Sequence, residues 1–243
     1  YAKDGHALFR IRALKTLKNI YDDIIEAGEI GGYVEKEDNL SQEGSCWIYD
    51  DAMVYHDAFV QDDALICQNA QVFGFANIRD KTFVMNNAKI YDHASCWGEA
   101  AINDNAIIEG AAHISDGIIQ GNAKICDDAV IRKGICQNNV IVSGKAVLSG
   151  YFILDGNMKI NHTSDLISVG QIGTDERIYF INQPDNIYVH CVSFHGTIDN
   201  FRTAKFNNKY SEFEIGQYEL TINYAIKYFE MVNIYKKKMM EKI

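Results

Sequence analysis

Small and aliphatic residues recur along the chain with a period of six. Between Ser45 and Asp116 the sequence divides into twelve consecutive hexads, each with a small residue followed two positions later by an aliphatic one, as in Ala52/Val54 and Ala76/Ile78. Positions two apart point to the same side of a strand, and the Asp, Asn, Gly and His residues between the pairs favour turns. The period therefore predicts short strands joined by corners, with three hexads closing one triangular coil of a parallel β-helix.

The period continues less regularly to about residue 162. Two units of only five residues, GIIQG at 117–121 and GICQN at 134–138, fall on the same wall of the predicted coil. We expect a missing residue to tighten or distort the same corner twice. One corner stacks Asp51, Asn69, Asn87 and Asn105, and asparagines stacked in this way can share side-chain amide hydrogen bonds.

Residues eighteen apart stack at about 4.8 Å, so each outward-facing residue can be assigned to a wall. The first wall carries a run of apolar outward residues: Trp47, Tyr49, Leu65, Cys67, Phe83 and Met85. An apolar patch of this size is seldom left in water. We interpret it as an interaction surface, for which self-association is the leading explanation. The alternative is cover by the N-terminal segment or by the C-terminal domain.

The hexads are flanked by segments without the period. Residues 1–38 contain a predicted strand around Phe9–Ala13 and are assigned as a capping segment, because the end coil of a β-helix exposes unpaired strand edges. Residues 39–162 form the predicted β-helix. Residues 163–243 are predicted to be an α+β domain with three strands, a helix capped by Thr197 and a long final helix. The predicted buried face of that helix consists of Tyr218, Ile222, Ala225, Phe229 and Val232.

Together these features resemble a known family. The hexads are similar to those of hexapeptide-repeat left-handed β-helix proteins, and the aromatic residues that follow several aliphatic positions, such as Tyr49 and Tyr55, resemble an uncharacterised phage and prophage type. The segments GEIGGYVEKEDNLSQEG at 28–44 and HCVSFHGTIDNF at 190–201 resemble the two end motifs of that type. The resemblance implies a mainly β, left-handed β-helix with a small C-terminal α+β domain. It also implies a homo-oligomer, either a dimer or a trimer.

Composition narrows the classes of partner. The 243 residues carry a formal net charge of −10, which argues against direct nucleic-acid binding and favours a basic partner. No apolar run is long enough for a membrane span. Six scattered cysteines without a CxxC pair do not match a zinc site. We therefore expect reduced thiols and a cytoplasmic location, which would be the host cytoplasm for a phage-encoded chain.

The histidines are the only candidates for chemistry. Hexapeptide acyltransferases typically use a histidine as general base, and the coils contain His56, His93, His113 and His162. His56 and His93 fall at one corner two coils apart, without a carboxylate placed to orient either. His190 and His195 are five apart, and residues five apart on one strand face opposite ways, so joint metal binding needs a bend. We assign no catalytic residue, no metal site and no cofactor.

The leading hypothesis is therefore a non-catalytic binding or interaction protein of phage or prophage origin, with the β-helix as a rigid scaffold. The resemblance suggests a host protein as its target, including an antiviral-defence component in the manner of an anti-CRISPR protein. The alternatives are a hexapeptide-family acyltransferase that uses an acyl-CoA and a structural assembly protein.

Overall fold

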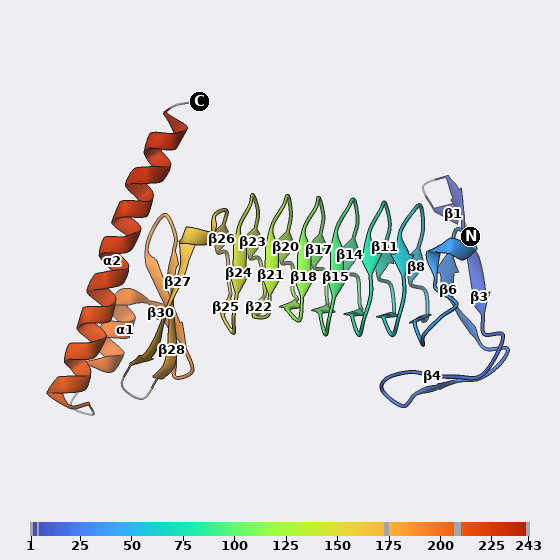
Figure 1. Cartoon of the computed structure of the whole chain (residues 1–243), viewed down its shortest axis with the longest axis horizontal. Coiled ribbons are helices and arrows are strands. Elements are labelled where there is room, and N and C mark those ends of the chain that lie inside the picture. Colours follow the sequence, from blue (N-terminus) through green and yellow to red (C-terminus); the bar gives the residue numbers. More distant parts are fainter. Residues whose placement is uncertain (1, 4, 173–174, 207–209, 242–243) are drawn as a thin grey trace. The chain divides into compact units, whose positions relative to one another are not determined.

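The chain forms two compact units in a computed structural model, which describes residues 2–3, 5–172, 175–206 and 210–241 (Figure 1). The units are Tyr1–Lys159 and Ile160–Ile243. The first is a β-helix of parallel stacked coils with N-terminal elements, and the second joins an antiparallel sheet to two helices. The mainly β fold with a small α+β region, predicted from the sequence, is confirmed.

Three sheets form the walls of the β-helix, and successive strands along the chain belong to successive walls. The first wall contains β7 (Trp47–Ile48), β10 (Leu65–Ile66), β13 (Phe83–Val84), β16 (Ala101–Ile102), β19 (Ile118–Ile119), β22 (Ile135–Cys136) and β25 (Ile153–Leu154). The second contains β8 (Met53–Val54), β11 (Gln71–Val72), β14 (Lys89–Ile90), β17 (Ile107–Ile108), β20 (Lys124–Ile125), β23 (Ile141–Val142) and β26 (Lys159–Ile160). The third contains β9 (Phe59–Val60), β12 (Asn77–Ile78), β15 (Ser95–Trp97), β18 (His113–Ser115), β21 (Val130–Arg132) and β24 (Val147–Ser149).

The small and aliphatic residues of the hexads fill the interior. Ala76 and Ile78 are both fully buried, as are the corresponding Ala52 and Val54. Each strand inside a wall pairs in parallel with the strands one coil before and after it, so Leu65 lies between Trp47 and Phe83. The predicted register is therefore confirmed, because these neighbours are the residues that the six-residue period places eighteen apart.

The two five-residue units lie on the first wall, as predicted, and glycine takes the small position in each. The carbonyl of Gly117 accepts from the amide of Ala101, and the carbonyl of Gly134 accepts from the amide of Ile118. A Cβ atom on Gly134 would lie 2.7 Å from the ring of Phe152. The shortened corner therefore excludes a side chain there, and Phe152 of the next coil occupies the space.

Acidic side chains at the corners bind the backbone of the following coil. Asp62 and Asp80 have φ values of 58° and 56°, in the left-handed region that Asp and Asn tolerate better than most residues. A carboxylate oxygen of Asp62 accepts from the amide of Asp80 at 3.2 Å, and one of Asp80 accepts from the amide of Gly98 at 2.8 Å. Asp at a corner thus permits the turn and also links two coils.

An asparagine ladder follows another corner. Asn69 donates to Asn87 at 3.4 Å, and Asn87 donates to Asn105 at 3.3 Å, which confirms the predicted side-chain bonds. The same bonds continue through Asn122, Asn139 and Asn157. Asp51, which shares the corner, instead pairs with Arg10 at 2.6 Å. The ladder is a structural feature of the coils, because its amides bond to one another.

The N-terminal elements close one end of the β-helix. The strand β3 (Phe9–Arg12) pairs antiparallel with β6 (Ile30–Val34), and β6 extends the second wall by pairing with β8. Two short hairpins accompany them: β1 (Ala2–Lys3) with β2 (His6–Ala7), and β4 (Leu17–Lys18) with β5 (Ile24–Ile25). A 3-10 turn, η1 (Glu37–Asn39), then leads into the first coil. The predicted strand around Phe9–Ala13 is present and pairs at the edge of the second wall.

The C-terminal unit packs helices on a four-stranded antiparallel sheet. It consists of η2 (Thr163–Asp165), β27 (Leu166–Ile172), β28 (Asp175–Asn182), β29 (Ile187–Cys191), β30 (Phe194–Thr197), α1 (Ile198–Lys205) and α2 (Glu212–Met240). Thr197 caps α1, and all five residues of the predicted inner face of α2 are buried, as expected. Their core partners include Phe180 and Phe201. Among the described residues, neither helix combines the length and the apolar character needed to cross a membrane.

Candidate functional site

The predicted interaction surface on the first wall is largely covered from within the same unit. Trp47 is only 4% exposed and Leu65 only 2%, and both pack against Ala13 and Ile25 of the N-terminal segment. The hydroxyl of Tyr49 accepts from the side-chain amide of Asn19 at 3.0 Å. The structure therefore supports the alternative explanation for this part of the wall, because the N-terminal segment buries the apolar patch.

The remainder of that surface is a shallow depression of about 500 Å³ that includes Cys67, Phe83 and Met85. Tyr21 covers one side of it, with its ring centroid 6.0 Å from that of Phe83. Burial raises the pKa of the Cys67 thiol to about 12. At neutral pH this thiol is protonated and a poor nucleophile, so the depression offers apolar contact area and not a reactive thiol.

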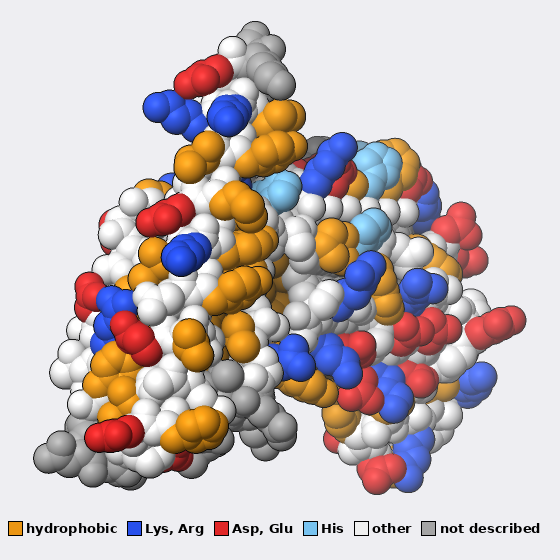
Figure 2. All heavy atoms as spheres, turned by 60° about the vertical axis from the view of Figure 1, so that its left-hand side comes forward, with side chains coloured by type: hydrophobic (Ala, Val, Ile, Leu, Met, Phe, Trp, Pro, Cys, Tyr) orange, Lys and Arg blue, Asp and Glu red, His pale blue; other side chains and the backbone are white. Residues whose placement is uncertain are grey.

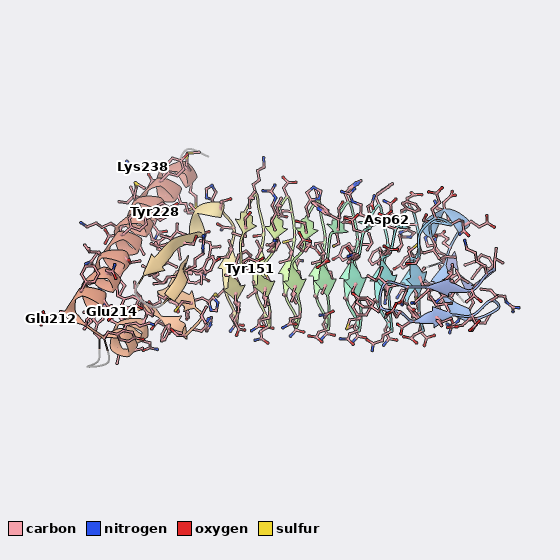
Figure 3. The ribbon with its side chains drawn as sticks, turned by 60° about the horizontal axis from the view of Figure 1, so that its bottom comes forward. Asp62, Tyr151, Glu212, Glu214, Tyr228 and Lys238 are labelled. Carbon is pink, nitrogen blue, oxygen red and sulfur yellow. The ribbon has the colours of Figure 1, made fainter. Side chains whose placement is uncertain are left out.

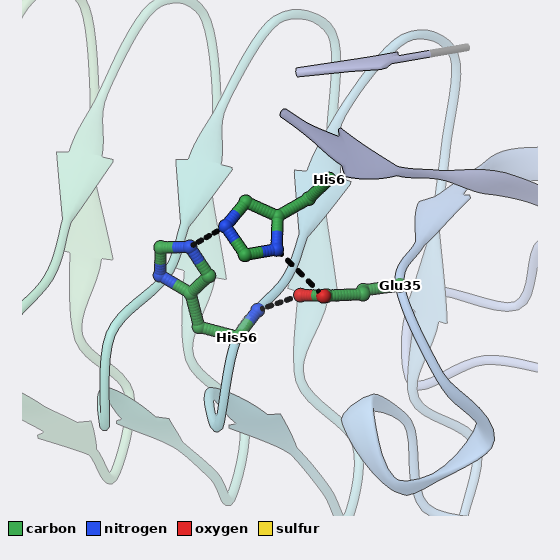
Figure 4. Close-up of side chains that lie close together, drawn as sticks. All are labelled: His6, Glu35 and His56. Atoms are coloured by element: carbon green, nitrogen blue, oxygen red, sulfur yellow. Dashed lines mark hydrogen bonds and ion pairs between the residues drawn. The ribbon is translucent and has the colours of Figure 1, made fainter. Parts of the chain in front are cut away.

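A cluster of two histidines and one carboxylate lies at the N-terminal end of the β-helix (Figure 4). His6 Nδ1 is 2.8 Å from Glu35 Oε1, and His6 Nε2 is 3.1 Å from His56 Nε2. The second carboxylate oxygen of Glu35 accepts from the backbone amide of His56 at 2.6 Å. One metal-ligating atom from each of the three residues can be chosen so that all lie within 4.8 Å of one another.

The β-helix holds this cluster through its backbone. His56 lies at a corner with a φ of 57°, directly after Tyr55 of the second wall. Asn39 is fully buried, and its side-chain amide donates to the carbonyls of His56 and Ala58 at 2.9 and 2.8 Å. Its oxygen accepts from the amide of Glu35 at 3.1 Å. One asparagine therefore fixes both the corner that carries His56 and the segment that carries Glu35.

Electrostatics fixes the protonation of part of the cluster. The hydrogen bond with His6, followed by the one from the backbone amide of His56, holds the pKa of Glu35 below its usual value. An ionised Glu35 is an acceptor only, so His6 must carry a proton on Nδ1. When His6 is neutral, its Nε2 presents a lone pair toward His56. The cluster can therefore pass a proton between two imidazoles or hold a cation between them.

The sequence contains no signal that would join these three residues. His6 and His56 are separated by fifty positions, and Glu35 lies in the segment before the first hexad. Only the antiparallel return of the N-terminal strands along the second wall brings them together. The hexad pattern predicts His56 as a coil histidine but indicates no partner for it.

The other histidines of the coils contact different neighbours. His93 stacks on Phe75 with 4.8 Å between ring centroids, and His113 lies 5.6 Å from the ring of Trp97. His162 caps η2 by accepting from the amide of Ser164. These contacts give the acyltransferase alternative no additional support.

His190 and His195 are opposite each other on adjacent strands. The turn between β29 and β30 supplies the bend that joint binding would need, and the two ring centroids are 5.7 Å apart. Burial, and then the neighbouring His195, lowers the pKa of His190. No carboxylate orients this pair among the described residues, so it is a weaker candidate than the cluster on His6.

The final helix has a second apolar face in addition to the buried face that its sequence predicts. Phe213, Leu220, Tyr224, Met231 and Tyr235 are each more than half exposed, and we call them the α2 stripe. Their spacings of seven and four residues keep them on one side of an α-helix. Figure 2 shows hydrophobic side chains in a column along this helix. The stripe lies apart from the buried face, so α2 has two apolar sides.

No protein-family model matches the chain, and no curated protein matches it either.

Proposed function

We propose that this protein is a non-catalytic interaction protein, in which the β-helix is a rigid scaffold and the α2 stripe joins two copies of the chain. The exposed stripe is the observation that carries the proposal. A continuous apolar face on a long helix is a common interface for helix pairing. Full burial of an apolar side chain of this size contributes roughly 1.5–3 kcal/mol. Several such residues from each copy offset a large part of the entropy lost on association.

The charges of α2 favour an antiparallel pair. Its first half carries Glu212, Glu214 and Glu219 and no basic residue, whereas its second half carries four lysines and only one carboxylate, Glu230. Figure 3 shows Glu212 and Glu214 at one end of the helix and Lys238 toward the other. A twofold axis across the middle of α2 places each acidic half beside the basic half of the partner. The helix dipoles then oppose each other, which is also favourable.

The oligomeric state of the full chain tests the proposal. We expect light scattering to give a dimer for wild type and a monomer for Leu220→Glu combined with Met231→Glu, because two charges would be forced into the apolar contact. Both positions are exposed, so helical circular dichroism should not change. The matched control is Asn200→Glu with Thr203→Glu, which adds the same charge on the exposed side of α1 and should leave the dimer intact. A monomeric wild type, or a dimer that survives the double substitution, would overturn the proposal.

Disulfide trapping tests the orientation. Lys227 lies near the middle of α2, whereas Phe213 lies fourteen residues away, roughly 21 Å along the helix. In an antiparallel pair, Lys227→Cys lies close to its own counterpart and should cross-link under mild oxidation. Phe213→Cys should not, because its counterpart is roughly 40 Å away. Cross-linking at both positions would indicate a parallel pair, and the native cysteines provide the background in the unsubstituted chain.

The polar outer surface of the scaffold then remains available for a different protein. The net charge of −10 favours a basic partner, and the resemblance to the phage type points to a host protein, including a component of antiviral defence. The monomeric variant separates the two roles: we expect it to retain the partner if the β-helix walls bind it, and to lose the partner if the paired helices do.

A further inference from the structure

We propose that His6 and His56 bind a divalent transition-metal ion, with Zn²⁺ as the representative species, through their two Nε2 atoms. The site is independent of self-association through α2. It would connect the N-terminal hairpin of β1 and β2 to the corner between β8 and β9 in the first coil. Imidazole nitrogen is the preferred protein donor for Zn²⁺, Ni²⁺ and Cu²⁺, which defines the class of ion.

The distance between the two nitrogens fits a shared ion. Zinc lies about 2.0–2.1 Å from an imidazole nitrogen, and two such ligands at a tetrahedral centre are about 3.3 Å apart. The Nε2 atoms of His6 and His56 are 3.1 Å apart, so an ion can replace the proton that otherwise lies between them. The separation of the two nitrogens therefore needs little change.

Glu35 prepares His6 for this role. Because its carboxylate accepts from Nδ1 of His6, the free lone pair of the neutral ring is on Nε2, which faces His56. A carboxylate that holds the far nitrogen of a ligating histidine is the usual arrangement in protein metal sites. Both oxygens of Glu35 are already used, one by His6 and one by the amide of His56. We therefore assign Glu35 as the group that orients a ligand, and we expect water to complete the coordination.

The surroundings permit exchange with solvent and keep the ligands in place. The side chains of His6 and Glu35 are 39% and 27% exposed, so an ion can reach them. The ring of His56 contacts those of Tyr55 and Phe73 with centroid distances of 4.8 and 6.2 Å, which restricts its rotation. The hydrogen bonds of Asn39 hold the backbone of the same corner. The site thus combines an accessible side with fixed ligand positions.

Calorimetric titration of the untagged chain with Zn²⁺ tests the proposal. A His195→Ala background removes the second histidine pair, and there we expect one saturable site per chain. His6→Ala and His56→Asn should each abolish it; asparagine is chosen at position 56 because it tolerates the left-handed backbone. Glu35→Gln should weaken binding by about 10–100-fold. The matched control is His93→Asn, at the same corner two coils away, which should bind like the background protein.

Thermal unfolding followed by tryptophan fluorescence provides a second readout. Both tryptophans, Trp47 and Trp97, belong to the β-helix unit. Zn²⁺ should raise the midpoint of the background protein and of His93→Asn, and should have no effect on His56→Asn. The proposal fails if the background protein shows no saturable binding, or if His56→Asn binds Zn²⁺ as tightly as the His93→Asn control. In either case the histidines are a hydrogen-bonded pair only.

Discussion

Two 3-10 turns, η1 before the first coil and η2 after the last, solve the same local problem with different chemistry. Each follows an extended residue, Lys36 or His162, and each ends in a polar residue that is almost fully buried, Asn39 or Asp165. The buried side chain accepts from the backbone amide of the extended residue, at 2.9 Å for Asn39 and 3.2 Å for Asp165. The two turns are thus closely similar in their backbone contacts.

The two turns differ in the other hydrogen-bond partners of the buried side chain. Asn39 donates to two carbonyls of the following coil, those of His56 and Ala58, so a neutral amide is satisfied by backbone alone. Asp165 has no following coil and instead accepts from Nζ of Lys236 at 2.5 Å. A carboxylate buried in this way needs a cation. At these two turns, the buried polar group is satisfied by backbone carbonyls where another coil follows, and needs a side chain from a distant element where the coils end.

We expect the largest effect when the buried amide of η1 is replaced by a carboxylate, the group that η2 has in the same place. Asn39→Asp places a carboxylate opposite two carbonyl oxygens without a cation, and should destabilise the β-helix by about 3–5 kcal/mol. Urea unfolding followed by tryptophan fluorescence measures this unit. Gln42→Glu, which adds a charge at an exposed position nearby, should be nearly neutral. If the two variants unfold alike, the amide of Asn39 is not specifically required.

The converse change removes the lysine of α2 that pairs with the buried carboxylate of η2. Lys236→Met leaves the carboxylate of Asp165 without a cation, and because the lysine side chain is 28% exposed we expect a loss of about 1–3 kcal/mol. Circular dichroism at 222 nm measures the C-terminal unit, since both described α-helices belong to it. Lys237→Met, at the exposed neighbouring position, is the control. An equal loss in both variants would show that Lys236 acts through helix stability and not through Asp165.

A double substitution sharpens the comparison further. Adding Asp165→Asn to Lys236→Met removes the buried charge and should restore about 1–2 kcal/mol of what the single substitution loses. The restored stability is the coupling between the two residues, measured from the same dichroism unfolding curves. Additive losses would mean that Asp165 and Lys236 are not electrostatically coupled. The buried side chain of η2 would then not depend on a cation, as that of η1 does not.

We expect the smallest effect at a half-buried ion pair on the second wall. Glu109 and Lys124 lie 2.6 Å apart on the second wall, and their side chains are 21% and 38% exposed. Burial alone would raise the pKa of Glu109, but the hydrogen bonds from Lys124 and Tyr91 outweigh it and lower that pKa. The stabilisation is therefore present above the ordinary pKa near 4.5 and is lost as pH falls through the lower folded value. Glu109→Gln should cost at most about 1 kcal/mol at pH 7, with the difference from wild type disappearing in acid urea titrations.

The repetitive part of this fold could be predicted from sequence because its contacts are local in pattern. A small residue and an aliphatic residue two positions apart, repeated every six residues, can bury themselves only on short strands with corners between them. Ala76, the asparagine ladder from Asn69 and the glycines of the two five-residue units follow from that repetition. Thr197 and the inner face of α2 follow in the same way from helical capping and period.

The contacts that form the candidate sites do not recur along the chain, so no period in the sequence indicates them. The sequence by itself determined which residues of the first wall face outward, but only the tertiary structure showed that Ile25 covers Leu65. It likewise brought His6 beside His56, because antiparallel strands return a segment whose position no repeat encodes. The physical reason is general to both cases. Periodicity records which side of an element is buried, whereas the identity of the group that buries it depends on how distant segments pack.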